Sequence, residues 1–433
     1  MKYTTLLFLV LVSFSLAQQI IQSHNLKKQK IAFGSCNKFF RNHKSDIFYD
    51  IAKQNPDVWV WLGDVAYLDN MSLPAYWIPE SDFNQIKLKL DATKYDPAYQ
   101  EMLKKVNAEV GVWDDHDYGH NNSGMTFKYK EHIRQVWLDF FNEPQNSERR
   151  TRDSGIYTSY YLGEQKKIKI ILTDVRWNRQ STDILGEKQW KWLEQELNDP
   201  LVELFILGTG SQFLPDDRFI PETWDIKSKE RFYYIVNKTR ASVVIISGDV
   251  HYAELMEHPC SQKKVGYKLV EITSSALSFN FNSISYGEFE SANYFVFTTP
   301  TYNEEKDRFN GMNYGIIEVE WDENNIGSTI IKLQVYTKGQ IEKPVLERIY
   351  KLEEFKYSEE RQQNSKSCIV DDIPANDRWK AFALNNLKKL LTEFNPQIII
   401  GASIKIVTLV LLLRFYWYLI YMVFFYQIKE KKD

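Results

Sequence analysis

The sequence predicts an α/β protein built as a helix-flanked β-sandwich, with layers in the order α, β, β, α. Short apolar segments of strand length recur through the first 250 residues, and longer amphipathic or charged segments separate them. Three further strand-like segments then follow one another with turns but no helix between them. The chain is 44% apolar and 15% aromatic, which is ample for a large core. Two packed sheets covered by helices satisfy all three observations.

The first group of strands is predicted from apolar runs that lack polar alternation, as in strands buried on both faces. These runs are 30–36, 57–64, 109–115, 168–174, 203–210 and 242–249. Segments 186–198 and 227–239 are predicted helices between strands. We expect the six runs to form one α/β layer. The later segments 267–275, 314–321 and 328–336 are expected to form the second sheet.

Both ends of the chain carry targeting signals. Residues 1–17 combine Lys2, an apolar run and a small-x-small ending at Ala17, which predicts a signal peptide. Residues 405–427 are almost continuously apolar and match the roughly 20 residues that cross a bilayer. We therefore expect a secreted domain with a membrane anchor.

The expected order of parts follows from these two signals. The change in composition along the chain predicts a folded domain at 18–352, a polar stalk at 353–400 and a short tail at 428–433. Lysines in the tail place it in the cytosol. The prediction is a single-pass type I membrane protein. Its domain would be lumenal or extracellular, in the endoplasmic reticulum, another secretory membrane or the cell surface.

Glycosylation patterns fit an exported chain, whereas an odd number of cysteines fits it poorly because one must stay unpaired. Cys260 and Cys368 could pair, which would leave Cys36 free. Acceptor sequons for glycosylation begin at Asn70, Asn121 and Asn237. The net charge of −3 provides no basic surface for nucleic acid, so a polynucleotide substrate is not expected.

Ligand-type side chains follow the predicted strands at their carboxyl ends. These residues are Cys36, Asp64, Asp114, Asp115, Asp174 and Asp249. In open α/β sheets the crevice for chemistry lies beyond these strand ends. A single aspartate there is usually a turn or capping residue. Several together would raise one another's pKa unless a positive charge neutralised them, so we expect two or more metal ions.

Six motifs resemble one family when they are taken in order. They are "FGSC", "WLGDVAY", "WDDHDYGHNNSG", "LTDVRWNR", "SGDVHYAEL" and "EITSSAL". Over residues 30–345 the chain is similar to the alkaline phosphatase D (PhoD-like) family of metallophosphatases. This family is a branch of the calcineurin-like phosphoesterases. The resemblance implies the αββα fold of metallophosphoesterases.

The same resemblance implies a centre that holds Fe³⁺ and Ca²⁺. Cys36, Asp64 and Tyr67 would bind iron, with Asp64 bridging to calcium. Asp249 and His251 would complete the cluster, and Asn121 would bind calcium through its amide oxygen. Other metals remain open, because Cys, Asp and His also bind zinc.

The "WDDHD" segment is similar to the third motif of the wider superfamily. That similarity favours Asp115 over Asp114 as the metal ligand, although the two adjacent residues differ only in register. His116 would donate a proton or a hydrogen bond to the transferred phosphate. Arg176 is either a phosphate clamp or the partner of Asp174 in an ion pair. Ser274 and Ser275 are expected to be structural hydroxyls.

The predicted function is therefore hydrolysis of phosphate monoesters by a metal-activated hydroxide. The substrate would be a small phosphate ester or a lipid or glycan headgroup. One alternative is a membrane-associated phosphodiesterase that cleaves lipid or glycan phosphodiesters. A second alternative is a catalytically inactive calcium-binding ectodomain, because fold and function separate easily.

Overall fold

A computed structural model gives the fold of the protein. It describes residues 19–38, 46–73, 76–78, 82–215, 222–280 and 305–365. The chain divides into two compact units, Met1–Trp379 and Lys380–Asp433, and every described residue belongs to the first. The predicted signal peptide (1–17) and membrane span (405–427) lie outside the described residues. Within the described part, no helix combines the length and apolarity needed to cross a bilayer.

The larger sheet has eight strands. Its centre is a parallel set of β8 (Ile168–Leu172), β9 (Leu204–Thr209), β10 (Val243–Ser247) and β12 (Val270–Ser274). The antiparallel strands β7 (Thr158–Leu162) and β11 (Ala253–Glu257) flank this set. Two-residue strands, β1 (Ile20–Ile21) and β13 (Arg308–Phe309), form the edges.

The second sheet has six strands. β2 (Lys28–Gly34), β3 (Val58–Leu62) and β6 (Ala108–Val112) are parallel. β14 (Asn313–Glu320), β15 (Ile330–Thr337) and β16 (Leu346–Lys351) continue it as an antiparallel meander from β2. A separate two-stranded ribbon pairs β4 (Asn70–Leu73) with β5 (Tyr76–Ile78).

The predicted division of strands between the sheets was wrong. The first three predicted strands lie with β14 and β15 in one sheet, and segment 267–275 supplies β12 of the other. A close side-chain fit specifies one of these pairings: a Cβ at Gly315 of β14 would lie 2.2 Å from the ring of Phe33 on β2. Apolar periodicity identifies a strand but does not encode which neighbour it pairs with.

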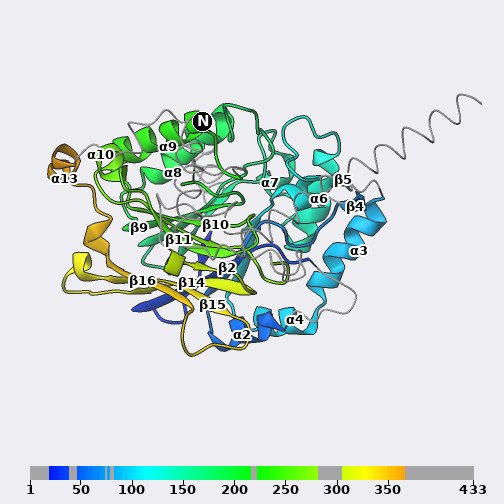
Figure 1. Ribbon diagram of the computed structural model, residues 1–433, viewed down its shortest axis with the longest axis horizontal. Helices are drawn as coiled ribbons and strands as arrows, with labels where there is room; N and C mark the ends of the chain where they lie inside the picture. The colour runs from blue at the N-terminus through cyan, green and yellow to red at the C-terminus, as the bar shows by residue number, and fades with distance from the viewer. Residues whose placement is uncertain are drawn as a thin grey trace, which may run out of the picture. The chain divides into compact units, whose positions relative to one another are not determined.

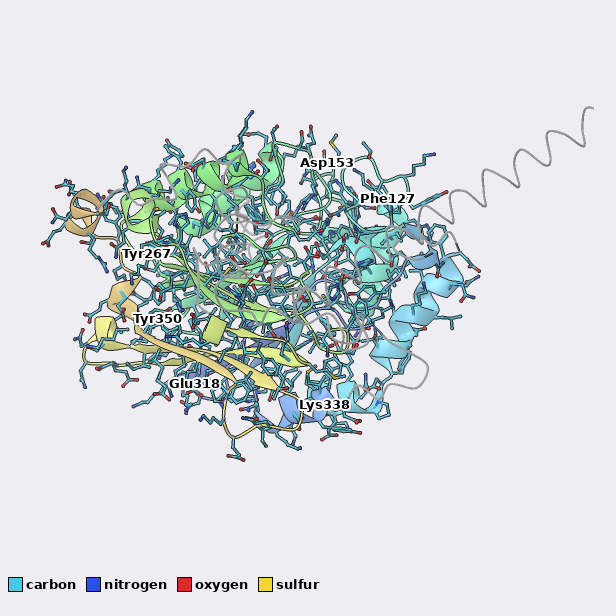
Figure 2. All side chains as sticks on the ribbon, viewed as in Figure 1. Phe127, Asp153, Tyr267, Glu318, Lys338 and Tyr350 are labelled. Atoms are coloured by element: carbon cyan, nitrogen blue, oxygen red, sulfur yellow. The ribbon has the colours of Figure 1, made fainter. Side chains whose placement is uncertain are left out.

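The two sheets pack face to face. In β2 and β3, residues such as Ile31, Val58 and Val60 belong to a core shared with the larger sheet. Their neighbours Ala32, Trp59 and Trp61 face the opposite way, into a second core with helices. Side chains fill the interior between the layers (Figure 2). The period of two along each strand thus serves both faces of the sheet.

Helices cover the outer faces of both sheets, which confirms the predicted αββα fold (Figure 1). On the larger sheet lie α8 (Glu187–Leu197), α9 (Ile226–Thr239) and α10 (Ser261–Val265), the first two where the sequence predicts helices. Over the smaller sheet lie α2 (Ile47–Lys53), α3 (Phe83–Lys94), α4 (Pro97–Leu103) and α6 (Lys130–Phe140). Short helices α5 (Asp115–Tyr118) and α7 (Glu148–Thr151) follow β6.

Local capping explains where several helices begin. Asp96 accepts hydrogen bonds from the backbone N–H groups of Ala98 and Tyr99, and Pro97 occupies the first turn of α4. Asp225 caps α9 in the same way through the N–H of Ser228. A side-chain oxygen at this position satisfies backbone donors that have no partner within the helix.

The segment after β16 also packs on the domain. It contains the 3₁₀ turn Leu352–Glu354 and α13 (Glu359–Asn364), and two other 3₁₀ turns lie at Glu305–Asp307 and Ile326–Ser328. Phe355 is buried, and the side-chain amide of Gln362 donates to the Asn237 Oδ1 at 2.9 Å. The stalk expected from residue 353 is therefore folded against the domain as far as 365.

The described cysteines differ in state. Cys36 is a free, buried thiol. Cys260 is disulfide-bonded, and its expected partner, Cys368, lies outside the described residues.

Candidate metal centre

Loops at the carboxyl ends of four strands form the centre. Cys36 follows β2, Asp64 follows β3, Asp115 follows β6 and Asp249 follows β10, so both sheets contribute. Asp174, after β8, does not join them. Its carboxylate accepts the backbone N–H groups of Ile156, Arg176 and Trp177 and stabilises a turn.

Unusual backbone conformations direct these side chains to one place. The φ angles of Cys36, Asp64, Asp249 and His251 are 59°, 52°, 78° and 61°, in the left-handed region. Such a conformation costs a non-glycine residue roughly 1–2 kcal/mol. Gly248 makes the turn after β10 possible, because a Cβ there would lie 2.5 Å from the backbone oxygen of Leu62. Strain of this kind gathers at functional sites.

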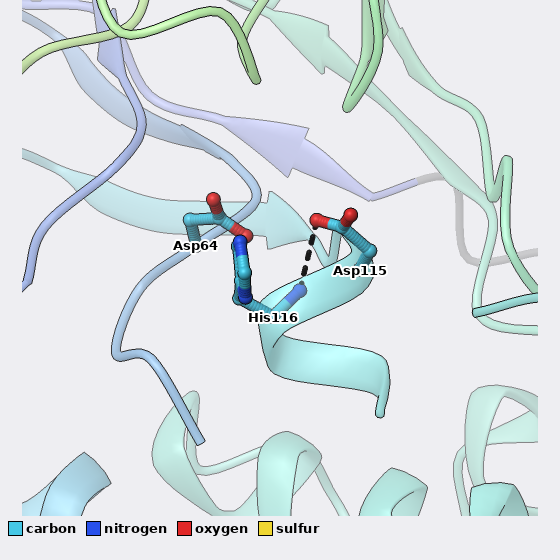
Figure 3. Close-up of side chains that lie close together, drawn as sticks. All are labelled: Asp64, Asp115 and His116. Atoms are coloured by element: carbon cyan, nitrogen blue, oxygen red, sulfur yellow. Dashed lines mark hydrogen bonds between the residues drawn. The ribbon is translucent and has the colours of Figure 1, made fainter. Parts of the chain in front are cut away.

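Two overlapping groups of ligand atoms result. Asp64, Asp115 and His116 each place a ligand atom within 4.8 Å of the others, as do Asp114, Asp115 and Asp249. Figure 3 shows the first group, with the N–H of His116 donating to the Asp115 Oδ1 at 2.9 Å. Asp115 belongs to both groups, so it lies at the centre of the cluster.

A soft-ligand corner adjoins Asp64. The Cys36 Sγ lies 3.5 Å from the Asp64 Oδ2 and 3.1 Å from the Ser275 Oγ. The Tyr67 hydroxyl lies 3.4 Å from the His251 Nδ1. Ligand atoms that share one cation at about 2.0–2.3 Å lie roughly 3–4 Å apart, so these separations suit a metal ion.

The carboxylates themselves call for a cation. The Asp64 Oδ1, Asp114 Oδ2 and Asp249 Oδ2 are buried without a hydrogen-bond partner among the described residues. Burial raises the pKa of all three groups, and neighbouring carboxylates raise it further. An unpartnered buried carboxylate is costly unless a proton or a cation neutralises it. The donor set therefore fits bound metal ions.

Asp114 and Asp115 have different surroundings. The Asp114 Oδ1 accepts from the Arg176 Nε at 2.5 Å, and Asp114 also caps α5. Burial would raise the pKa of Asp115, but the charges of Arg176 and His116 hold it below its ordinary value. Asp114 thus has a cationic partner within the protein, whereas Asp115 faces the cluster.

His116 is held by a residue that the sequence analysis missed. Its Nδ1 lies 2.7 Å from the Oδ2 of buried Asp69. Burial would lower the pKa of His116, but Asp115, Asp64 and Asp69 together raise it to about 10. The available signal was a second aspartate five residues after Asp64 in "GDVAYLD". The ring of His116 is therefore oriented by Asp69 at its Nδ1.

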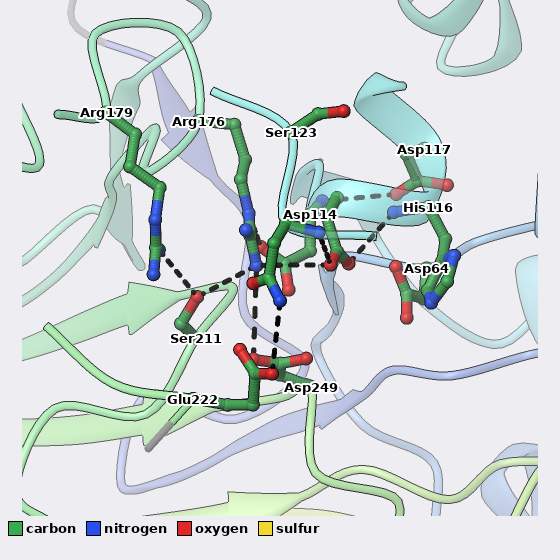
Figure 4. A network of polar contacts seen from close by, with 12 residues as sticks. Asp64, Asp114, His116, Asp117, Ser123, Arg176, Arg179, Ser211, Glu222 and Asp249 are labelled. Atoms are coloured by element: carbon green, nitrogen blue, oxygen red, sulfur yellow. Dashed lines mark hydrogen bonds and ion pairs between the residues drawn. The ribbon is translucent and has the colours of Figure 1, made fainter. Parts of the chain in front are cut away.

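Arg176 is fully buried within the carboxylate cluster (Figure 4). Besides Asp114, its Nη2 lies 3.8 Å from the Asp115 Oδ2 and 3.9 Å from the Asp249 Oδ2. Only its backbone N–H contacts Asp174. The side chain therefore neutralises the cluster, and it forms no ion pair with Asp174, the partner considered from the sequence.

The turn after α5 contributes a different asparagine from the expected one. Asn121, the asparagine expected to bind calcium, is exposed. The backbone N–H of Asn122 donates to the Asp115 Oδ2 at 2.7 Å, and its side-chain amide donates to the Glu222 Oε1 at 3.4 Å. Glu222, also missed by the sequence analysis, lies beside Asp249 in Figure 4.

Comparison with known proteins identifies the family of this chain. The family described as PhoD-like phosphatase matches residues 31–329. The chain belongs to this family of phosphoester hydrolases, as its motifs predict. No curated protein matches the sequence.

Solved structures extend the comparison. The fold is similar to one titled "Structure of PhoD", with 14% identity, a TM-score of 0.55, and coverage of 76% of this chain and 69% of that one. "GAP50 the anchor in the inner membrane complex of Plasmodium" is 12% identical with a TM-score of 0.42, over 82% of this chain and 95% of that one.

Proposed function

We propose that the protein hydrolyses phosphate monoesters with the help of bound metal ions. The observation that carries this proposal is that one carboxylate oxygen of each of Asp64, Asp114 and Asp249 is buried and accepts no hydrogen bond from the described residues. They lie at the carboxyl ends of strands in a chain of the PhoD-like phosphatase family. A protein that only needed a stable core would gain nothing from burying them.

We assign the ligands by their chemistry. Cys36, Tyr67 and His251 would hold Fe³⁺ together with Asp64, because thiolate, phenolate and imidazole suit a transition metal. Asp115 and Asp249 would hold Ca²⁺, which prefers oxygen ligands, and Asp64 would bridge the two ions. When bound, such ions stabilise the charge of the phosphate and lower the pKa of water.

The remaining residues of the site have proposed roles in proton transfer or in structure. Asp69 orients the His116 ring through Nδ1, and His116 would donate a proton to the leaving oxygen. Ser274 and Ser275 have structural partners: Ser274 donates to the Asn313 Oδ1 at 2.7 Å, and Ser275 contacts Cys36. Ser275 also accepts the backbone N–H of His251 at 3.1 Å, so both hydroxyls have structural contacts and we propose no covalent phosphoenzyme.

The test is hydrolysis by the purified full-length chain in detergent. Rates with p-nitrophenyl phosphate and bis-p-nitrophenyl phosphate are measured before and after chelation, with metal content determined on the same sample. We expect monoester turnover that chelation abolishes. Faster cleavage of the diester would favour the phosphodiesterase. A metal-loaded protein that cleaves neither ester would favour the binding ectodomain.

We also propose that the domain is exported and anchored. The segments 1–17 and 405–427 have the composition of a signal peptide and a membrane span. The disulfide-bonded state of Cys260 supports an oxidising compartment. Protease protection of the domain in intact microsomes or cells tests this orientation, because a cytosolic domain would be digested without detergent.

A further inference from the structure

A second arginine, Arg179, lies beside the candidate metal centre (Figure 4). Arg179 is partly exposed, and its Nη1 contacts the Ser211 Oγ at 3.5 Å. It forms no ion pair with any residue that the structure describes, whereas Arg176 lies among three carboxylates. The two arginines of the "VRWNR" motif therefore differ in their direct contacts, although the charges of Asp114, Asp249 and Glu222 also act on Arg179.

The position of Arg179 is fixed by its backbone. Its carbonyl accepts the N–H of Met125 at 3.2 Å, and its own N–H donates to the carbonyl of Arg176 at 3.2 Å. Gly124 allows this approach, because a Cβ there would lie 2.9 Å from the Arg179 oxygen. The loop that carries Asn122 thus holds Arg179, and only the guanidinium end is left to contact a ligand.

The guanidinium lies close to the cluster. The Ser211 Oγ accepts from the Arg176 Nη2 at 3.1 Å as well as from Arg179, so one hydroxyl joins the two side chains. Figure 4 shows both guanidinium groups directed towards Ser211, with Asp249 and Glu222 nearby. A molecule bound at the carboxylate cluster would therefore lie within reach of Arg179.

Electrostatics favour an anion at this place. Burial and the neighbouring charge of Arg176 lower the pKa of Arg179. Arg176 pairs with Asp114, whereas Arg179 has no ion pair with a described residue and is partly exposed. A guanidinium presents parallel N–H donors that match two oxygens of a phosphate.

We propose that Arg179, not Arg176, binds the terminal oxygens of the substrate phosphate and selects monoesters over diesters. This inference rests on the proposed phosphatase function. A monoester carries close to two negative charges at neutral pH and has three terminal oxygens. A diester carries one charge, and its second ester group occupies one of those positions. The Arg179 guanidinium, in addition to the metal centre, therefore favours binding of the monoester.

The experiment compares Arg179→Gln and Arg179→Lys with the full-length wild type. Arg231→Gln is the matched control, because Arg231 lies on α9 and pairs with Glu187 at 2.7 Å. Measurements are kcat/KM for p-nitrophenyl phosphate and for bis-p-nitrophenyl phosphate, metal content, and the Kd of orthophosphate by calorimetry. Orthophosphate binding provides a readout that does not depend on turnover.

The expected result is specific to the monoester. Arg179→Gln should lower its kcat/KM by roughly 10- to 100-fold, mainly through KM, and weaken orthophosphate binding about tenfold. The diester rate should change less than about threefold, and Arg179→Lys should fall between. Metal content and the Arg231→Gln rates should equal those of the wild type.

Two results would overturn the assignment: equal losses for both esters, or an unchanged Kd for orthophosphate. If the wild type hydrolysed neither ester, the proposed function would fail, and calorimetry alone would decide. Weaker orthophosphate binding by Arg179→Gln would then still support the anion site, and unchanged binding would refute it.

Discussion

Replacing Asp69 with asparagine tests how the centre holds its proton donor. The Asp69 Oδ2 lies 2.7 Å from the His116 Nδ1, and both side chains are buried. Asparagine keeps the size of the side chain and removes its charge. A hydrogen bond to a charged group contributes about 1.5–3 kcal/mol, so kcat/KM should fall roughly 10- to 150-fold.

The pH dependence separates this positioning role from a loss of structure. The Asp69 carboxylate is one of the groups that raise the pKa of His116. A proton donor must be protonated to act, so the alkaline limb of the kcat/KM profile should move to lower pH in Asp69→Asn. Metal content should not change.

The control for this experiment is Asp153→Asn, which removes an exposed carboxylate paired with Lys188. It should leave the rate and the pH profile as in the wild type. An Asp69→Asn enzyme with wild-type kcat/KM and an unmoved alkaline limb would refute the reasoning.

Three further predictions concern stability and metal binding. Burial raises the pKa of Glu109 to about 8. The folded state therefore keeps a proton that the unfolded state releases, so the free energy of unfolding should fall by about 2–4 kcal/mol as pH rises from 4.5 to 8. Glu109→Gln should remove this pH dependence, as measured by urea unfolding at several pH values. Gly63→Ala should lower the free energy of unfolding by about 2–4 kcal/mol, because the new Cβ would lie 2.3 Å from the Asp114 Cβ. The control is Gly339→Ala, whose Cβ would have no atom within 4 Å and which should cost only about 1 kcal/mol. Cys36→Ser should reduce iron affinity by at least about tenfold and alter any visible absorbance; unchanged iron content would contradict the ligand assignment.

The sequence was sufficient to predict that candidate ligand residues follow the ends of buried strands. Cys36, Asp64, Asp115 and Asp249 follow buried strands, and parallel strands that share an edge bring such residues together. This prediction needs only local sequence patterns. The same patterns predicted α8 and α9, because an apolar stripe at helical spacing is also a local property.

Pairings between distant residues could not be derived in this way. Gly315 and Phe33 come into contact only because β14 pairs with β2. The apolar pattern of either strand does not specify this pairing. Asp69 and His116 lie 47 positions apart, and their contact depends on how the loop after β3 turns towards α5. A motif shows which residues are present, but not which atoms they contact.

The sequence by itself determined the class of fold and the family, because strand periodicity and residue type are properties of short segments. Only the tertiary structure decided which arginine pairs with the protein's own carboxylates and which has no ion pair among the described residues. Arg176 and Arg179 lie three residues apart in one motif, yet the first points into a buried cluster and the second lies at its side. That difference follows from packing against Asp114, which is distant in sequence.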